Sequence, residues 1–259
     1  MRKLLAIAAF LLCALTAQAQ TGVTTVGPVT INGGATLGGA SAASFSPVFS
    51  SAGNCSSGTV SCTVTLSVTA GQFVVCGEGS TATSITLTCS DSDGDTITSS
   101  PSSNPYTNSG AAWTLGLKYG SLTHTNASEV FTCTASSSEF TLACAIGVYS
   151  GTPTSGWDVA LAGNSQNGFG SGNTTLNSGT TTTTANASEL AIGFFMVNTS
   201  AYLGISQSGS WNLRTSNANN VGFAFVDLTL TTTGTYTAAL LVNETSLGNN
   251  AAGIISTIK

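Results

Sequence analysis

Residues 62–68, Cys-Thr-Val-Thr-Leu-Ser-Val, alternate apolar and polar side chains without a break. Successive side chains of a strand point to opposite faces, so this heptad predicts a β-strand with one buried face and one wet face. The same alternation recurs along the chain, which is rich in threonine, a residue whose branched Cβ favours strands. No long stretch has apolar residues at helical spacing. The chain is therefore expected to be all-β.

Residues 71–76 are apolar on both faces, which predicts a central strand. Clusters of Gly, Asn, Ser and Pro separate the strand-like segments and predict turns. No internal repeat of fixed period is visible. The sequence thus predicts a single domain over residues 46–259 with an antiparallel two-sheet β-sandwich of the jelly-roll type. Its further strands are expected near 85–89, 113–119, 140–148, 190–197, 221–230, 236–242 and 253–258.

The N-terminal residues have the pattern of an export signal. Arg2 and Lys3 precede an apolar run over 4–16, and a small-x-small cleavage site follows at 17–19. We expect a signal peptide over 1–19 and a secreted protein, extracellular or periplasmic. Residues 20–45 are rich in Thr, Gly, Ala and Ser, and predict a flexible extension or an edge strand. No later apolar run is long enough for membrane insertion.

Charge is scarce in this chain, which has 5 basic and 10 acidic residues. Once the two signal-peptide cations are removed, Lys118, Arg214 and Lys259 remain, and the net charge becomes −7. Nucleic-acid binding needs a basic face that replaces counterions, so that class of function is excluded.

Six cysteines remain after the signal, and an even number in an exported chain predicts disulfides. We expect each cysteine to pair with its neighbour across a turn, because each such pair flanks a turn-like stretch. A zinc site is the alternative, but its ligand spacing is absent and the chain has 1 histidine. The expected pairs are Cys55–Cys62, Cys76–Cys89 and Cys133–Cys144.

The order of several short motifs resembles a family of secreted bacterial jelly-roll domains, β-sandwiches of the concanavalin A-like lectin type. The motifs extend over residues 46–259, and the resemblance implies two antiparallel sheets packed face to face. The family has no established catalytic residues to transfer. The matching segments are Thr69-Ala70-Gly71-Gln72, Asp91 to Ile97, Tyr149-Ser150-Gly151 with Asp158, Ala187-Ser188-Glu189-Leu190 and Thr257-Ile258-Lys259.

Asp91, Asp93 and Asp95 place three carboxylates at alternate positions around Gly94. Calcium takes several oxygen ligands in loops of this kind, but the bidentate glutamate of the helical calcium loop is missing. Asp and Gly also suit a tight turn with positive φ. The turn is the favoured interpretation, and calcium is the cofactor alternative.

Two tryptophans have polar neighbours in Gly- and Ser-rich surroundings, namely Trp157 beside Asp158 and Trp211 beside Asn212. An exposed ring next to a carboxylate or amide would form a carbohydrate-binding platform. The favoured interpretation is that the rings cap the ends of the core, because aromatic side chains bury large areas.

Acid–base chemistry has few candidates here. His124, the 1 histidine, lies among polar residues typical of a solvated loop tip. Glu129, Glu139 and Glu189 are available for glycoside hydrolysis, but no pattern in the sequence pairs them. We therefore expect no catalytic residues.

The sequence favours a secreted, non-enzymatic protein with a structural, adhesive or surface-interaction role. The alternatives are a carbohydrate-binding module and a glycoside hydrolase of lectin-like fold. The expected partners are carbohydrate or another cell-surface protein. In a further variant, residues 20–31 add as a strand to a neighbouring subunit and drive self-assembly.

Overall fold

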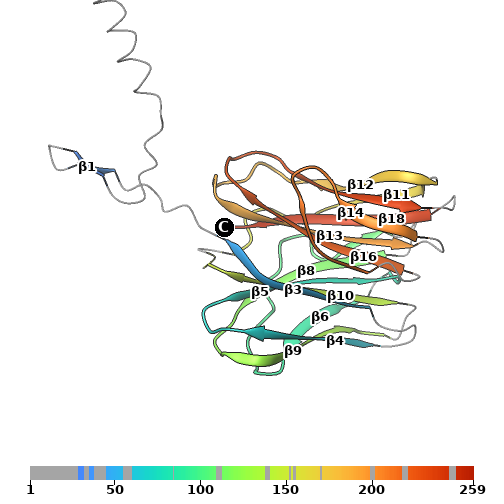
Figure 1. Ribbon diagram of the computed structural model, residues 1–259, viewed down its shortest axis with the longest axis horizontal. Coiled ribbons are helices and arrows are strands. Elements are labelled where there is room, and N and C mark those ends of the chain that lie inside the picture. The colour runs from blue at the N-terminus through green and yellow to red at the C-terminus, as the bar shows by residue number, and fades with distance from the viewer. Residues whose placement is uncertain are drawn as a thin grey trace, which may run out of the picture. The chain divides into compact units, whose positions relative to one another are not determined.

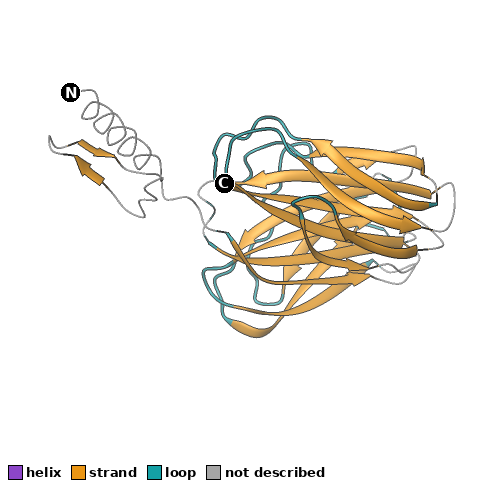
Figure 2. Ribbon diagram, turned by 45° about the horizontal axis from the view of Figure 1, so that its top comes forward, coloured by secondary structure: helices purple, strands orange, loops and turns teal. Residues whose placement is uncertain are grey.

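The computed structural model describes most of the chain after residue 44 and two short segments before it. The described residues are 29–31, 35–37, 45–54, 60–83, 85–108, 113–137, 141–151, 153, 156–169, 171–198, 202–217, 221–244 and 249–259. They belong to two units, Met1–Ala42 and Ala43–Lys259. Every described regular element is a strand, so these ranges contain no helix able to cross a bilayer. Figure 2 shows the strands of the second unit joined by loops.

The first unit contains an antiparallel hairpin of β1 (Val29–Ile31) and β2 (Ala35–Leu37), with Val29 opposite Leu37. Strand β1 coincides with one strand-like piece expected within residues 20–45. The expected signal peptide and residues 20–28 lie outside the described residues.

The second unit contains strands β3 to β18, which form four antiparallel sheets. Their orders are β4-β9-β6, β3-β10-β5-β8-β7, β11-β18-β13-β16-β15 and β12-β17-β14. The bounds are β3 Ser46–Asn54, β4 Ser61–Val68, β5 Phe73–Ser80, β6 Leu87–Asp91, β7 Tyr106–Asn108, β8 Trp113–Ser121, β9 Asn126–Ala135, β10 Leu142–Ser150, β11 Ala162–Phe169, β12 Gly172–Thr180, β13 Glu189–Asn198, β14 Tyr202–Gln207, β15 Asn212–Asn217, β16 Val221–Leu230, β17 Thr237–Glu244 and β18 Asn249–Ile258.

The four sheets are stacked as layers, with the two five-stranded sheets inside and the three-stranded sheets outside (Figure 1). Three apolar clusters fill the spaces between successive layers. The middle cluster joins the inner sheets and includes Phe73, Trp113, Phe194 and Phe225. All-β class is thus confirmed for the described chain, and the strand orders are compatible with the expected jelly roll.

The expectation of two sheets was wrong, since the second unit has four. In β5, Phe73 and Val75 enter the middle cluster, whereas Val74 and Cys76 enter the cluster beneath the outer sheet. Strand β13 divides its side chains between two clusters in the same way. The central strands of the inner sheets, such as β5 and β10, are therefore buried on both faces, which is why their sequences do not alternate. Outer strands such as β4 keep the alternation of one buried and one exposed face.

The second unit repeats its topology, which the sequence search missed. Adding eight to each strand number converts the orders of the first two sheets into those of the last two. The turns before β5 and β13 also match. The Thr69 amide donates to Gln72 Oε1 at 2.7 Å, and the Asn186 amide donates to Glu189 Oε1 at 2.9 Å. The two halves therefore share an architecture and a capped turn without a sequence period.

The inner sheets fit together through small residues on one side and large residues on the other. A Cβ on Gly77 would lie 2.6 Å from Cδ2 of Phe194, and a Cβ on Gly79 would collide with the sulfur of Met196. The glycines of β5 thus leave room for the bulky side chains of β13. Such close packing resists changes in volume on either side.

Two disulfides join the outer sheet β4-β9-β6 to the neighbouring inner sheet. Cys76–Cys89 links β5 to β6, and Cys133–Cys144 links β9 to β10. Both pairings are confirmed, and each bridge joins strands of two different sheets. Cys62 is also disulfide-bonded, whereas Cys55 lies outside the described residues. The two disulfides indicate an oxidising environment.

Candidate functional site

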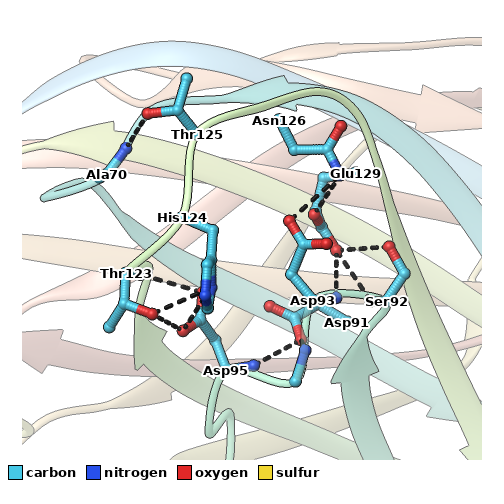
Figure 3. A network of polar contacts seen from close by, with 11 residues as sticks. Ala70, Asp91, Ser92, Asp93, Asp95, Thr123, His124, Thr125, Asn126 and Glu129 are labelled. Atoms are coloured by element: carbon cyan, nitrogen blue, oxygen red, sulfur yellow. Dashed lines mark hydrogen bonds and ion pairs between the residues drawn. The ribbon is translucent and has the colours of Figure 1, made fainter.

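A network of polar contacts joins the end of β6 and the loop that follows it to the segment before β9 and the start of β9 (Figure 3). Asp91, Asp93 and Asp95 come from the first part, and the second contributes Thr123, His124, Asn126 and Glu129. Gly94 at the turn has φ +84°, a conformation that glycine adopts without strain. The expected aspartates therefore do lie together, at one end of the outer sheet.

Glu129 holds this loop from within. It is buried, and its Oε1 accepts hydrogen bonds from the Ser92 amide at 2.8 Å, the Ser92 hydroxyl at 2.7 Å and the Asp93 amide at 3.1 Å. Its Oε2 accepts from Asn126 at 2.9 Å. Burial opposes ionisation, but the hydrogen bonds from Ser92 and Asp93 prevail and hold the pKa of Glu129 below its ordinary value. Glu129 is therefore a structural anchor of the loop.

Asp91 closes the tight turn. Its Oδ1 accepts from the amides of Gly94 and Asp95, both at 2.8 Å, and its Oδ2 is buried without a hydrogen-bond partner. Burial is the main cause that raises the pKa of Asp91, and the nearby charges of Asp95 and Glu129 add to it. An aspartate that bonds amides a few residues ahead is a standard turn-forming contact.

Asp95 bonds to the opposite segment. Its Oδ2 accepts from the Thr123 amide at 2.9 Å and its Oδ1 from the Thr123 hydroxyl at 2.5 Å. Nδ1 of His124 lies 3.5 Å from Oδ1 of Asp95, and 3.0 Å from the Thr123 hydroxyl. Burial opposes ionisation of Asp95, but the bonds from Thr123 and the nearby His124 lower its pKa.

The His124 geometry does not match nucleophilic catalysis. A catalytic histidine binds its orienting acid at one ring nitrogen and its nucleophile at the other. Here Asp95 and Thr123 both approach Nδ1, and the His124 side chain is 55% exposed. The contacts therefore describe a solvated loop histidine.

The calcium alternative has one feature in its favour, the buried Oδ2 of Asp91. Against it, one or both oxygens of each carboxylate in the network already accept protein donors, including Asp93, which accepts from Asn126 at 3.1 Å. The turn interpretation accounts for these contacts, and calcium binding stays a prediction.

A groove continues from Asp95 along the outside of β8. Its volume is about 400 Å³, and its lining combines hydroxyl side chains, two glycines, one carboxylate and one aromatic ring. Segment 94–99 forms one wall and the end of β8 the other, because the Tyr119 amide donates to the Ser99 carbonyl at 2.8 Å. The lining residues are Gly94, Asp95, Thr96, Thr98, Ser99, Tyr119, Gly120, Ser121 and Thr123.

Trp157 lies behind this groove. Its Nε1 donates to the Ser99 carbonyl at 3.1 Å, and its ring meets the ring of Tyr119 edge-on with 5.7 Å between centroids. Trp157 is half-buried, and neighbouring Asp158 does not stand free beside it. The Asp158 side chain is 3% exposed and bonds Lys259 at 2.5 Å and the Ala185 amide at 2.6 Å. The pair therefore lacks the free carboxylate that the binding-platform alternative requires.

Trp211 and Asn212 are also structural. Trp211 is buried and its Nε1 donates to the Thr237 carbonyl at 3.0 Å. Asn212 donates to the side chain of Asp227 at 3.2 Å. The core interpretation is correct for Trp211, because its ring fills the cluster between the second inner sheet and the outer sheet above it.

The three cations of the described chain are all paired with carboxylates of low exposure. Lys118 lies 2.7 Å from Glu78, Arg214 lies 2.7 Å from Asp227, and Lys259 lies 2.5 Å from Asp158. Side-chain exposures of these carboxylates are 0%, 1% and 3%. Charge is thus used for internal cross-links, because a buried charge is costly unless it is paired.

Acids in or beside two of these ion pairs have shifted pKa values. Burial raises the pKa of Glu78 to about 7, although Lys118 opposes the shift. Burial opposes ionisation of Asp158, but Lys259 lowers its pKa, and the resulting charge adds to the burial that raises the pKa of Glu189. Neither Asp158 nor Glu189 lines the groove. Glu139 lies outside the described residues.

Glu78 is grouped with Cys89 and Cys133, whose sulfur atoms lie within 4.8 Å of one another and of its carboxylate. Both sulfurs belong to disulfides, so they offer no thiolate for zinc. This cluster of described residues is therefore part of a disulfide-linked core and not a metal centre.

Sequence reasoning did not find the groove or the ion pairs. Segment 94–99 shows one usable signal: buried Ile97 stands between exposed Thr96 and Thr98, as in a strand. Lys118 within the apolar stretch 113–121 also indicates a buried acid partner.

Comparison with known proteins adds no further assignment, since no family model, curated protein or solved structure matches this chain.

Proposed function

We propose that the protein is a secreted, non-enzymatic β-sandwich that acts through its surface, in a structural or adhesive role. One observation carries the proposal: Lys118, Arg214 and Lys259, the described cations, all neutralise buried carboxylates. Acid–base and electrostatic catalysis need poised charged groups at an accessible site. In the described chain the cations instead serve ion pairs with buried carboxylates, and hydroxyl and amide groups remain available for surface contacts.

The groove supports the same conclusion. Its lining contains one carboxylate, Asp95, whereas glycoside hydrolysis usually requires two across the scissile bond. The oxygens of Asp95 already bond to Thr123. A hydrolase is therefore the least supported of the three sequence-based hypotheses.

The experiment compares turnover with attachment. The purified protein, produced by secretion with its disulfides formed, is incubated with chromogenic glycosides and esters, and separately sedimented with insoluble polysaccharides and cell envelopes. We expect attachment to at least one solid and no turnover. Hydrolysis that disappears in a single carboxylate variant such as Asp95→Asn would overturn the proposal.

A carbohydrate-binding module is the second candidate. It is favoured by the groove, which places hydroxyl groups beside the half-buried ring of Tyr119 and contains no cation. Sugars are recognised by such combinations of hydrogen-bonding groups with an aromatic face.

We propose that each half of the second unit is a jelly roll, and that the short motifs of the chain reflect the lectin-like family that they resemble.

We also propose that residues 20–31 mediate self-assembly. Deleting them should then abolish polymers and leave a folded monomer, as measured by light scattering; polymers that persist would refute assembly through this segment.

A further inference from the structure

We propose that the groove beside β8 is the binding site for a neutral saccharide, with Tyr119 as its aromatic contact. This inference rests on the proposed non-enzymatic binding role and adds the ligand class and the residues. The groove of about 400 Å³ lies within the range of about 300–1,000 Å³ that small-molecule sites occupy.

The lining selects for a neutral, polyhydroxylated ligand. The lining includes five exposed residues that carry hydroxyl groups, namely Thr96, Thr98, Ser99, Ser121 and Thr123. A hydroxyl both donates and accepts hydrogen bonds, which matches the same dual capacity of sugar hydroxyls. Because the lining has no cation and includes a carboxylate, an anionic ligand would lack a partner and face repulsion. An apolar ligand would leave these hydroxyls without partners.

Asp95 is fixed at one end of the groove. Thr123 donates to both of its oxygens, at 2.9 and 2.5 Å. The Asp95 side chain is 5% exposed, so Asp95 closes this end of the groove and orients Thr123, which lines the groove. The lowered pKa of Asp95 keeps it ionised, which strengthens the hydrogen bonds from Thr123.

Tyr119 supplies the aromatic surface, and Trp157 positions it. The Ser99 carbonyl accepts both the Tyr119 amide at 2.8 Å and Nε1 of Trp157 at 3.1 Å. The Trp157 ring contacts the Tyr119 ring edge-on. One tryptophan thus holds the aromatic residue and a hydroxyl-bearing residue of the opposite wall. Trp157 is a positioning residue and not itself the aromatic platform.

Gly120 permits the walls to approach. A Cβ at this position would collide with the backbone carbonyl of Thr96. The close approach lets Ile97 insert into the core while Thr96 and Thr98 face outward. The groove is therefore built by contacts that leave little freedom in its shape.

The test measures binding of soluble oligosaccharides by calorimetry. The neutral probes are cellohexaose, xylohexaose and mannohexaose; a chitosan hexamer is the cationic probe and a polygalacturonate hexamer the anionic one. The double variant Thr98→Val/Ser121→Ala removes two hydroxyls of the groove with little change of shape. Its matched control, Ser61→Ala/Thr63→Val, removes two exposed hydroxyls from the outer face of β4.

We expect at least one neutral hexamer to bind. The groove variant should weaken binding at least tenfold, Tyr119→Ala should abolish it, and the β4 control should leave it unchanged. Trp157→Phe should weaken binding severalfold in the folded protein. A purely structural role for Trp157 would lower Tm and leave the affinity of the folded protein unchanged.

Other outcomes overturn the inference in distinguishable ways. If saccharides bind with the same affinity to the groove variants, the groove is not the binding site, but the proposed surface role stands. Binding of only the charged hexamers removes the neutral ligand class. Absence of all saccharide binding removes the inference, while sedimentation with cell envelopes still tests the proposed function separately. Cleavage of any hexamer refutes the proposed function itself.

Discussion

Tyr149 donates a hydrogen bond of 3.0 Å to Asp227 between the two inner sheets, and thereby links the repeated halves of the second unit. Both side chains are buried. Arg214 bonds to the same carboxylate oxygen at 2.7 Å and Asn212 to the other at 3.2 Å. Burial, followed by the charge of Asp227, raises the pKa of Tyr149 well above its ordinary value, so the phenol remains a donor.

Removing this charge should destabilise the protein far more than removing the phenol. Asp227→Asn leaves Arg214 without its counterion, and we expect a loss of about 3–5 kcal/mol in the free energy of unfolding. Tyr149→Phe deletes one hydrogen bond and should cost about 1 kcal/mol. Urea denaturation of both variants provides the comparison. Equal, small losses would show that the pair contributes little.

The packing of glycine against phenylalanine predicts a second effect. Gly77→Ala should lower the free energy of unfolding by about 1–3 kcal/mol, because its Cβ would overlap the ring of Phe194. Adding Phe194→Leu should recover part of the loss. Gly204→Ala, in β14, is the matched control, since nothing lies within 4 Å of a Cβ there. Thermal unfolding of the four proteins distinguishes local crowding from a general cost of replacing glycine.

Glu78 predicts a pH dependence. Its pKa in the folded protein is raised from 4.5 to about 7, mainly by burial. Between these values the folded protein holds a proton that the unfolded chain has lost. Stability from this group is therefore greatest below about pH 4.5 and falls as pH rises to about 7, by up to about 3 kcal/mol.

The Glu78→Gln variant isolates this contribution. Its stability, measured by urea denaturation from acid to neutral pH, should lack the decline that wild type shows over this window. Parallel profiles for the two proteins would show that Glu78 has an ordinary pKa.

The disulfides between layers should stabilise the first half. Replacing Cys76 and Cys89 by alanine opens a bridge with a sequence separation of 13, and we expect a loss of about 2–4 kcal/mol. Guanidinium unfolding checks the size of the loss. Thiol titration of the denatured wild type, without reductant, should find Cys76, Cys89, Cys133 and Cys144 oxidised; reactive thiols at these positions would contradict the pairing.

The acidic loop should be indifferent to calcium, because protein donors already bond at least one oxygen of each of its carboxylates. We expect roughly 1 mM calcium to leave Tm unchanged, although extracellular calcium modules bind in this range. Glu129→Ala should lower the free energy of unfolding by about 2–3 kcal/mol, since it removes the charged acceptor of the hydrogen bonds from Ser92 and Asp93. A calcium-dependent rise in Tm that Asp91→Asn removes would establish a metal site.

The all-β class and two cysteine pairings were predictable because alternation and turn signals are local properties of the sequence. The number of layers was not. The run over residues 73–76 shows that both faces of its strand are buried, but the covering elements come from distant parts of the chain. The disulfides illustrate the same limit, since Cys133 and Cys144 flank an arch between layers and not a hairpin within one sheet.

The repeat and the groove were invisible for related reasons. At the interface between the halves, Gly77 lies against Phe194, so the contact depends on complementary sizes and not on similar residues. The groove combines Thr98 with Ser121, and hydroxyl residues are too common in this chain to mark a site. Asp158 and Asn212 were singled out for their neighbouring tryptophans, but their actual partners, Lys259 and Asp227, are remote in sequence.

Among the described strands, β11 (Ala162–Phe169) has its only ladder partner in β18 (Asn249–Ile258). During synthesis the earlier strand must therefore wait for about 80 further residues before it can pair. Strand β3 waits for β10 in the same manner. Nascent chains would spend this interval with open strand edges, so their yield should depend on chaperones that keep them apart until the late strand arrives.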